Sequence, residues 1–336
     1  MTTGQRSVAV LGAGSWGTAL AIVLARNGAR VLLWGRDSAQ LQAMAAERRN
    51  ERYLPGIPLP EGLEPCTDLR ETVTAGDDLL LAVPSHAFRH TLATVAPWLA
   101  PARRLAWATK GLEPGSKKLL DQVVRESLGD DTDMAIISGP TFAREVARGL
   151  PTAVTVAGSD DDTAGHFARM LHDHTLRAYT STDLIGVQIG GAVKNVLALA
   201  AGIADGLGYG ANTRAALITR GLAEMMRLGV ALGGQPETFM GLTGLGDLVL
   251  TCTDDQSRNR RVGLALGQGV PLAEALVQVG QAVEGVKSAP EVRDLARSLG
   301  VEMPITEQVC RVVLDGVPPQ EAVQALLTRE PKPERL

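Results

Sequence analysis

Lys194 is the charged residue whose position in this sequence most suggests chemistry. It precedes Asn195 within the stretch 184–204, which is otherwise mostly apolar. Desolvation of an ammonium group is costly and lowers the pKa of a lysine toward neutrality. A lysine held in this way polarises a carbonyl group and supplies the proton that the oxygen needs after reduction. The alternative is a lysine whose side chain reaches solvent from a partly buried helix.

Two later segments carry polar side chains that suit an anionic substrate. Asp247 follows the glycine-rich segment 241–246 and enters an apolar run, so it is a candidate partner for Lys194, or else it caps the helix that follows. Ser257-Arg258-Asn259-Arg260-Arg261 places a hydroxyl, an amide and guanidinium groups before an apolar helix. That mixture binds phosphate or carboxylate. A solvated basic first turn is the commoner meaning of such a run.

The turn Gly12-Ala13-Gly14-Ser15-Trp16-Gly17 predicts a dinucleotide site. It follows the apolar run 8–11, opens the apolar helix 18–26 and is followed by a second strand at 30–34. In this context the first glycine permits the tight turn, the second lets the backbone approach a pyrophosphate, and the third allows the helix to pack closely on the sheet. The helix N-terminus then offers N–H groups to the anion. A turn that binds nothing is the alternative.

The residues after the second strand bear on which cofactor is used. The chain has Arg36 and Asp37 there. An arginine at this point suits the 2′-phosphate of NADP, whereas an acid suits the 2′-hydroxyl of NAD. We therefore expect NADP as the preferred cofactor and keep NAD as the alternative. Arg36 as a solvated surface charge is the third interpretation.

Lys110 and two histidines complete the candidate residues. Lys110 comes just after the predicted strand 105–108, at the sheet edge where open α/β folds bind ligands. His86 and His90 are four residues apart and could share a helix face, but no third ligand accompanies them. We expect no metal.

The elements that must position these residues change character along the chain. Short apolar runs alternate with helix-like stretches in the first half, which predicts a parallel, doubly wound sheet covered on both faces. We expect the strands at 8–11, 30–34, 79–83 and 105–108, with 134–137 and 153–156 added to the same sheet.

From about Ser181 apolar positions recur at helical spacing, which predicts an all-helical second domain. The predicted class is α/β, with a Rossmann-type doubly wound N-terminal domain over residues 1–182 and an all-α C-terminal domain over residues 183–336. Two domains also agree with a length of 336 residues, given roughly 150 residues per domain.

Composition excludes several other classes. A net charge of -4 leaves no basic excess for nucleic acid. Cys66, Cys252 and Cys310 lack any metal-ligand spacing and are expected as reduced thiols. The first residues lack the features of a secretory signal, and polar residues within 184–204 favour a buried core helix over membrane insertion. We expect a cytoplasmic protein.

Six motifs in order along the chain resemble those of bacterial NAD(P)-dependent glycerol-3-phosphate dehydrogenase. One such motif is weak, whereas six in register are specific. They are Gly12-Ala13-Gly14-Ser15-Trp16-Gly17-Thr18-Ala19-Leu20, Ala108-Thr109-Lys110-Gly111, Ser138-Gly139-Pro140-Thr141-Phe142-Ala143, Gly190-Gly191-Ala192-Val193-Lys194-Asn195, Gly244-Leu245-Gly246-Asp247 and Ser257-Arg258-Asn259.

The resemblance implies reversible reduction of dihydroxyacetone phosphate to sn-glycerol 3-phosphate for glycerophospholipid synthesis, by a homodimer. It implies that Lys194 is the acid/base and that Asp247 keeps it charged and oriented. The residues expected at the substrate are Lys110, Gly139, Thr141, Lys194, Asp247, Ser257, Arg258 and Asn259. Those expected at the cofactor are Gly12, Gly14, Ser15, Trp16, Gly17, Arg36, Lys110, Ala143, Arg258, Ala282 and Glu284.

One departure and two rival functions remain. The family often has a β-branched residue where this chain has Ala282, which weakens that contact. A different dehydrogenase of 3-hydroxyacid or 6-phosphogluconate type would share the architecture and the buried lysine. A non-catalytic NAD(P)H sensor would share the nucleotide domain, but it would need no proton donor such as Lys194.

Overall fold

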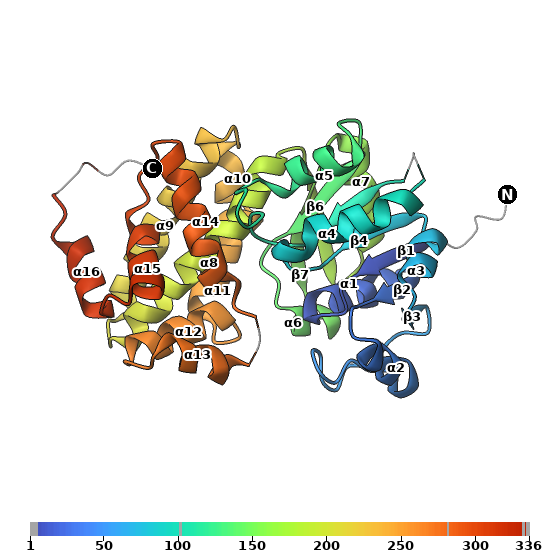
Figure 1. Ribbon diagram of the computed structural model, residues 1–336, viewed down its shortest axis with the longest axis horizontal. Helices are drawn as coiled ribbons and strands as arrows, with labels where there is room; N and C mark the ends of the chain where they lie inside the picture. The colour runs from blue at the N-terminus through green and yellow to red at the C-terminus, as the bar shows by residue number, and fades with distance from the viewer. Residues whose placement is uncertain (1–5, 101–102, 281, 331–332, 334–336) are drawn as a thin grey trace. The chain divides into compact units, whose positions relative to one another are not determined.

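The chain folds into two compact units. The computed structural model describes residues 6–100, 103–280, 282–330 and 333. The first unit runs to Glu113 and continues through Leu120–Leu184, and the second comprises Pro114–Leu119 and Ile185 onward. The sequence did not predict that residues 114–119 pack with the second unit. The first unit holds the sheet and the second is helical (Figure 1), which confirms the predicted fold class.

The first unit is built on one eight-stranded sheet. Its order is β3-β2-β1-β4-β5-β6-β7-β8, parallel from β3 to β6, with β7 antiparallel to β6 and β8 parallel to β7. The strands are β1 (Ser7–Leu11), β2 (Arg30–Trp34), β3 (Leu63–Cys66), β4 (Asp78–Leu81), β5 (Leu105–Trp107), β6 (Met134–Ser138), β7 (Thr152–Gly158) and β8 (Leu176–Ser181). All six predicted strands are present in this sheet.

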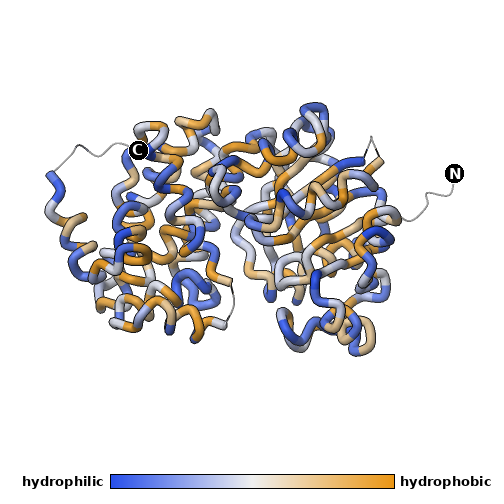
Figure 2. Tube along the Cα trace, viewed as in Figure 1, coloured by the Kyte–Doolittle hydropathy of each residue, from blue (hydrophilic) through white to orange (hydrophobic). Residues whose placement is uncertain are grey.

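The two edge strands were not predicted, and their sequences explain why. β3 reads LEPC, with a charge and a proline, and β8 reads LRAYTS, with three exposed residues. A strand at a sheet edge has one unpaired side, so it lacks the continuous apolar run of a strand buried on both faces. In Figure 2 the central strands are largely orange, the colour of apolar residues.

Helices of the first unit pack in groups on the sheet. α1 contacts α6 and α7, while α4 contacts α5. They are α1 (Ser15–Arg26), α2 (Ser38–Glu47), α3 (Leu69–Ala75), α4 (Ser85–Val95), α5 (Leu120–Leu128), α6 (Ala143–Ala147) and α7 (Asp161–Leu171), with the 3-10 turn η1 (Ala96–Trp98).

The strand register brings several loops to one edge of the sheet. Leu11 pairs with both Trp34 and Leu81, and Trp107 pairs with Leu81 and Ile136. The carboxyl ends of β1, β2, β4, β5 and β6 therefore lie side by side. Ligands bind at this edge in open α/β sheets.

The second unit is a bundle around the apolar helix α8. Its elements are α8 (Leu184–Gly206), α9 (Ala211–Ala231), α10 (Pro236–Met240), the π-helical segment η2 (Leu242–Gly246), α11 (Asp247–Thr253), α12 (Arg258–Gly267), α13 (Leu272–Val279), α14 (Glu284–Ser298), α15 (Pro304–Asp315) and α16 (Pro319–Leu327). By length and composition α8 passes as a membrane span, but 89% of its most apolar window is buried, as in a core helix.

A buried carboxylate joins two helices of this bundle. Glu224 on α9 is 1% exposed, and its oxygens accept hydrogen bonds from the backbone N–H groups of Ile305 and Thr306 and from the Thr306 hydroxyl, at 2.5 to 3.1 Å. Glu224 thus caps α15 from a neighbouring helix. Burial raises the pKa of Glu224 from an ordinary 4.5 to about 7, against the opposing effect of these hydrogen bonds.

This pKa predicts a pH-dependent stability. The folded protein holds the Glu224 proton more tightly than the unfolded chain, so the contribution of this residue to stability is present below pH 4.5 and is lost as pH rises to about 7. The loss is on the order of 3 kcal/mol. Glu224→Gln removes the titration, so urea unfolding followed by circular dichroism should show the variant gaining on the wild type between pH 5 and 8.

The control for this experiment is Glu237→Gln, which changes an exposed carboxylate of the same unit. Circular dichroism reports on the helices of the second unit, which contains Glu224. Tryptophan fluorescence would not, because all four tryptophans lie in the first unit. A difference between Glu224→Gln and wild type that stays constant with pH would show that Glu224 does not titrate in this range.

Candidate functional site

The glycine turn after β1 has the geometry that a pyrophosphate requires. Gly12 has φ +126°, and a Cβ there would lie 2.6 Å from the Ala82 carbonyl oxygen. A Cβ on Gly17 would lie 1.9 Å from the Gly12 carbonyl oxygen, whereas Gly14 has open space beside it. Gly14 is the N-cap residue of α1, so Ser15 and Trp16 form its first turn, where N–H groups lack intrahelical acceptors. The turn therefore fits a dinucleotide.

The end of β2 lies against this turn. A Cβ on Gly35 would be 2.9 Å from that of Ala13. Arg36 follows and is exposed. The Asp37 carboxylate accepts a hydrogen bond from the Gln40 N–H at 3.1 Å and so caps α2. That bond holds the pKa of Asp37 below its usual range, with a further contribution from Arg52.

A second group gathers at the ends of β5 and β6. The Lys110 ammonium lies 3.4 Å from the Gly139 carbonyl oxygen, which also accepts from the Thr141 hydroxyl at 3.2 Å. Gly139 has φ +148°, which favours glycine, and a Cβ there would be 3.1 Å from the Ala153 carbonyl oxygen. Ala143 begins α6 just beyond and is half-buried. Residues predicted from separate motifs thus meet at one carbonyl.

Lys194 lies at the centre of a third group, in the second unit. Its side chain is 9% exposed, and Nζ donates to Asp247 Oδ1 at 2.6 Å and to Thr251 Oγ1 at 3.0 Å. The Thr251 hydroxyl donates to the Asp247 carbonyl oxygen at 2.6 Å. The interpretation of Lys194 as a lysine that reaches solvent is therefore excluded. Gly246, rather than Asp247, is the N-cap of α11, and the Asp247 carboxylate pairs with Lys194.

Thr251 is the residue of this group that sequence reasoning missed. It follows Asp247 by four positions on α11, and residues four apart share a helix face. That spacing was the available signal. Burial raises the pKa of the neighbouring Cys252 thiol to about 12, so Cys252 is a neutral thiol and no nucleophile.

Asn195 and Asn259 link the Lys194 region to two further helices. Asn195 donates to Glu284 Oε2 at 3.1 Å and accepts from the Asn259 amide at 2.9 Å. Asn259 in turn accepts from the Gly285 N–H at 2.8 Å. Both amides are more than nine-tenths buried, so these bonds fix α8, α12 and α14 together. Ala282, also predicted, is exposed just before α14.

The run 257–261 is only partly solvated: Arg261 is exposed, whereas Ser257, Asn259 and Arg260 are buried. Ser257 caps α12 by accepting from the Arg260 N–H at 3.2 Å, which leaves its own hydrogen for donation. Arg260 is buried and donates to Asp205 at 2.7 Å and to the Cys252 carbonyl oxygen at 3.1 Å. Arg258 is half-buried at the first position of α12. Arg260 is thus structural, and Arg258 remains the candidate of this segment for the substrate phosphate.

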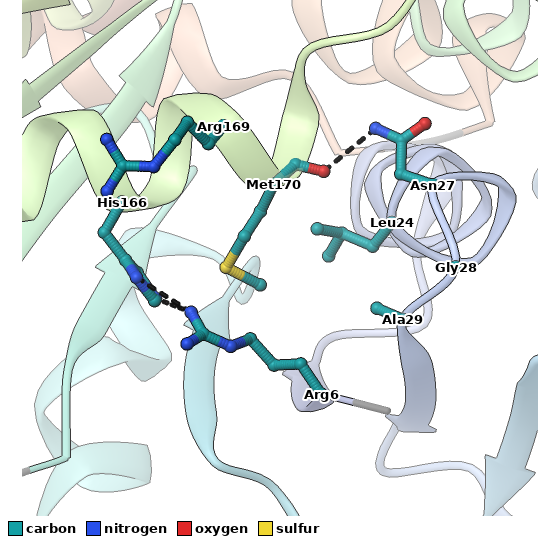
Figure 3. A pocket seen from close by; sticks show the side chains of 8 residues that line it. All are labelled: Arg6, Leu24, Asn27, Gly28, Ala29, His166, Arg169 and Met170. Atoms are coloured by element: carbon teal, nitrogen blue, oxygen red, sulfur yellow. Dashed lines mark hydrogen bonds between the residues drawn. The ribbon is translucent and has the colours of Figure 1, made fainter. Parts of the chain in front are cut away.

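A hollow of about 340 Å³ lies away from all predicted residues. Figure 3 shows Arg6 turned toward the His166 ring, to which its Nη1 approaches within 2.8 Å. His166 Nε2 lies 2.9 Å from Asp78 Oδ1. Arg6 precedes β1 and Asp78 begins β4, so this cluster sits at the amino edge of the strands, opposite the glycine turn.

The histidines expected not to bind metal are both exposed on α4, at His86 and His90. Among the residues that the structure describes, no three His, Cys, Asp or Glu side chains are grouped to hold a metal ion.

Two family models match consecutive parts of this chain, and both describe the family that the six motifs resemble. Residues 7–164 match the family model for the N-terminus of NAD-dependent glycerol-3-phosphate dehydrogenase, and residues 183–324 match the model for its C-terminus. The glycerol-3-phosphate dehydrogenase [NAD(P)+] of Nitrosococcus oceani is 62% identical over 97% of this chain and 94% of its own length. That of Aeromonas hydrophila is 56% identical over 98% and 99%.

A solved structure supports the same assignment. The crystal structure of glycerol-3-phosphate dehydrogenase from Coxiella burnetii superposes with a TM-score of 0.94 at 50% identity, covering 97% of this chain and 99% of that one. Sequence, fold and both family models therefore place this chain in the NAD-dependent glycerol-3-phosphate dehydrogenase family.

Proposed function

We propose that this protein catalyses the reversible NAD(P)H-dependent reduction of dihydroxyacetone phosphate to sn-glycerol 3-phosphate. The observation that carries the proposal is the buried Lys194 held by Asp247 and Thr251, in a chain that belongs to this family. A redox sensor needs no such group. The product would supply glycerophospholipid synthesis in the cytoplasm, and the working form would be a homodimer.

Lys194 would place its ammonium at the carbonyl oxygen. A bound nicotinamide would supply hydride for the carbonyl carbon, and the carbonyl oxygen would then need a proton, which Lys194 would donate. Asp247 Oδ1, 2.6 Å from Nζ, would keep the buried lysine charged, and Thr251 would fix the direction of the ammonium. In the reverse direction the neutral amine would accept the proton from the alcohol. Lys194, paired with Asp247, would therefore serve as both acid and base at the same substrate oxygen.

The substrate phosphate would bind at the start of α12. Arg258 offers a guanidinium, Ser257 a hydroxyl and Asn259 an amide beside the first turn of this helix. Lys110, Gly139 and Thr141 would complete substrate binding from the sheet edge. Binding energy from the phosphate then positions the carbonyl for reduction.

The cofactor would bind along the sheet edge. Gly12, Gly14, Ser15, Trp16 and Gly17 would hold the pyrophosphate, and Arg36 would favour NADP over NAD. Contacts from further along the chain would come from Lys110, Ala143, Arg258, Ala282 and Glu284.

A substrate comparison tests the function. Purified protein should oxidise NADPH or NADH with dihydroxyacetone phosphate, followed at 340 nm, and should yield sn-glycerol 3-phosphate. Activity with β-hydroxyacids or 6-phosphogluconate in its place would favour the rival dehydrogenases. Tight NADPH binding with no turnover of any of these substrates would favour a sensor.

Arg258→Ala tests the phosphate site. Loss of a charged hydrogen bond costs about 1.5 to 3 kcal/mol, so KM for dihydroxyacetone phosphate should rise about 10- to 100-fold. Arg261→Ala is the matched control, because Arg261 is an exposed arginine on the same helix. An unchanged KM in Arg258→Ala, or an equal rise in the control, would argue against a phosphate clamp at Arg258.

A further inference from the structure

The loop between α2 and β3 is tied to the glycine turn. Its ends meet in the bridge between Arg49 and Pro58. Asn50, 1% exposed, donates to the Ala13 carbonyl oxygen at 3.1 Å and to the Thr18 hydroxyl at 2.8 Å. A buried amide satisfied in this way holds the loop in a fixed place beside the turn.

A second anchor lies three residues further on. The Ser15 hydroxyl donates to the Tyr53 carbonyl oxygen at 2.9 Å, and the Tyr53 N–H lies 3.3 Å from the Asn50 side-chain oxygen. Arg52 stands between these two anchors. Its backbone is therefore positioned relative to the turn that fits the pyrophosphate.

The Arg52 side chain reaches the end of β2. Its Nη1 lies 2.9 Å from Asp37 Oδ2, and its guanidinium lies 5.2 Å from the centre of the Tyr53 ring. The other Asp37 oxygen caps α2 through the Gln40 N–H. Both carboxylate oxygens thus have partners, and Arg36 is the neighbouring residue. The Arg52 guanidinium, the Asp37 carboxylate and the adjacent residue Arg36 thus lie at the end of β2, where a bound dinucleotide would place its adenosine ribose.

We propose that Arg52 is a second determinant of cofactor specificity, which together with Arg36 binds the 2′-phosphate of NADP(H), and that Asp37 pairs with Arg52 in the absence of cofactor and does not accept a ribose 2′-hydroxyl. This inference rests on the proposed use of NADP. A phosphate monoester carries close to two negative charges at neutral pH and matches the planar fork of arginine. The ion pair that Arg52 would exchange is solvent-exposed, so loosening it costs little.

The test measures binding to the full-length protein by isothermal titration calorimetry, which needs no turnover. The ligands are NADPH, NADH and the fragments adenosine 2′,5′-bisphosphate and 5′-AMP. Arg52→Gln should raise Kd for NADPH and for the bisphosphate about tenfold, with NADH and AMP within twofold of wild type. Arg49→Gln, an exposed arginine in the same loop, should change none of the four values.

Asp37→Asn gives an independent arm of the test. Asparagine caps helices as well as aspartate does, so the start of α2 is kept. Removing the negative charge near the phosphate should lower Kd for NADPH about two- to fivefold and leave NADH unchanged. A tenfold loss of NADH affinity would show that Asp37 holds the ribose diol and would overturn its assigned role.

Arg36→Gln separates this inference from the proposed cofactor preference. If Arg36→Gln weakens NADPH selectively while Arg52→Gln does not, the role of Arg52 is wrong and the preference for NADP stands. If the wild type binds NADH as tightly as NADPH and Arg36→Gln changes neither, the preference itself is wrong. Because Arg52, Asp37 and Arg36 are all exposed, we expect each variant to fold. Circular dichroism of each variant checks this.

Discussion

An ammonium group without access to bulk water must have a permanent anionic partner, and this requirement organises the second unit. Lys194 is carried by the long apolar helix α8, where an isolated charge is costly and would be neutralised. Asp247 meets it from the first turn of α11, directly after the π-helical segment η2. η2 lies unusually close to α8, because a Cβ on Gly190 would be 2.6 Å from the Thr243 carbonyl oxygen. Gly190 permits this approach because it has no Cβ, and π-helical turns are frequent at functional sites.

The same constraint explains the polar network around the pair. A rigid charge is useful for proton transfer only if the groups that bind the substrate are fixed relative to it. Asn195 follows Lys194 directly and bonds to both Asn259 and Glu284, so the substrate and cofactor candidates on α12 and α14 are held to the lysine's own helix. Arg260, bound to Asp205, holds α12 to α8 from the other side.

Sequence reasoning recovered the features that depend on local pattern. The central strands appear as apolar runs and the glycine turn has a fixed spacing, so both were predictable. The edge strand β3, the Thr251 contact and the pairing of Asp37 with Arg52 were not. β3 and the Asp37–Arg52 pair depend on which segments meet in space, which no period or motif records. Thr251 was signalled only by its four-residue spacing from Asp247. The capping of α15 by Glu224 was also not predicted, because this carboxylate lies on another helix some eighty positions away in sequence.

We propose that Lys194 and Asp247 act as one unit on the substrate proton. A double-mutant cycle with Lys194→Met, Asp247→Asn and the pair, measured as kcat for dihydroxyacetone phosphate with NADPH Kd and circular dichroism as checks, tests it most directly. We expect Lys194→Met to lower kcat about 10²- to 10⁴-fold. The double variant should be no slower than Lys194→Met alone. Multiplying effects in the double variant, or near-normal kcat in Lys194→Met, would contradict it.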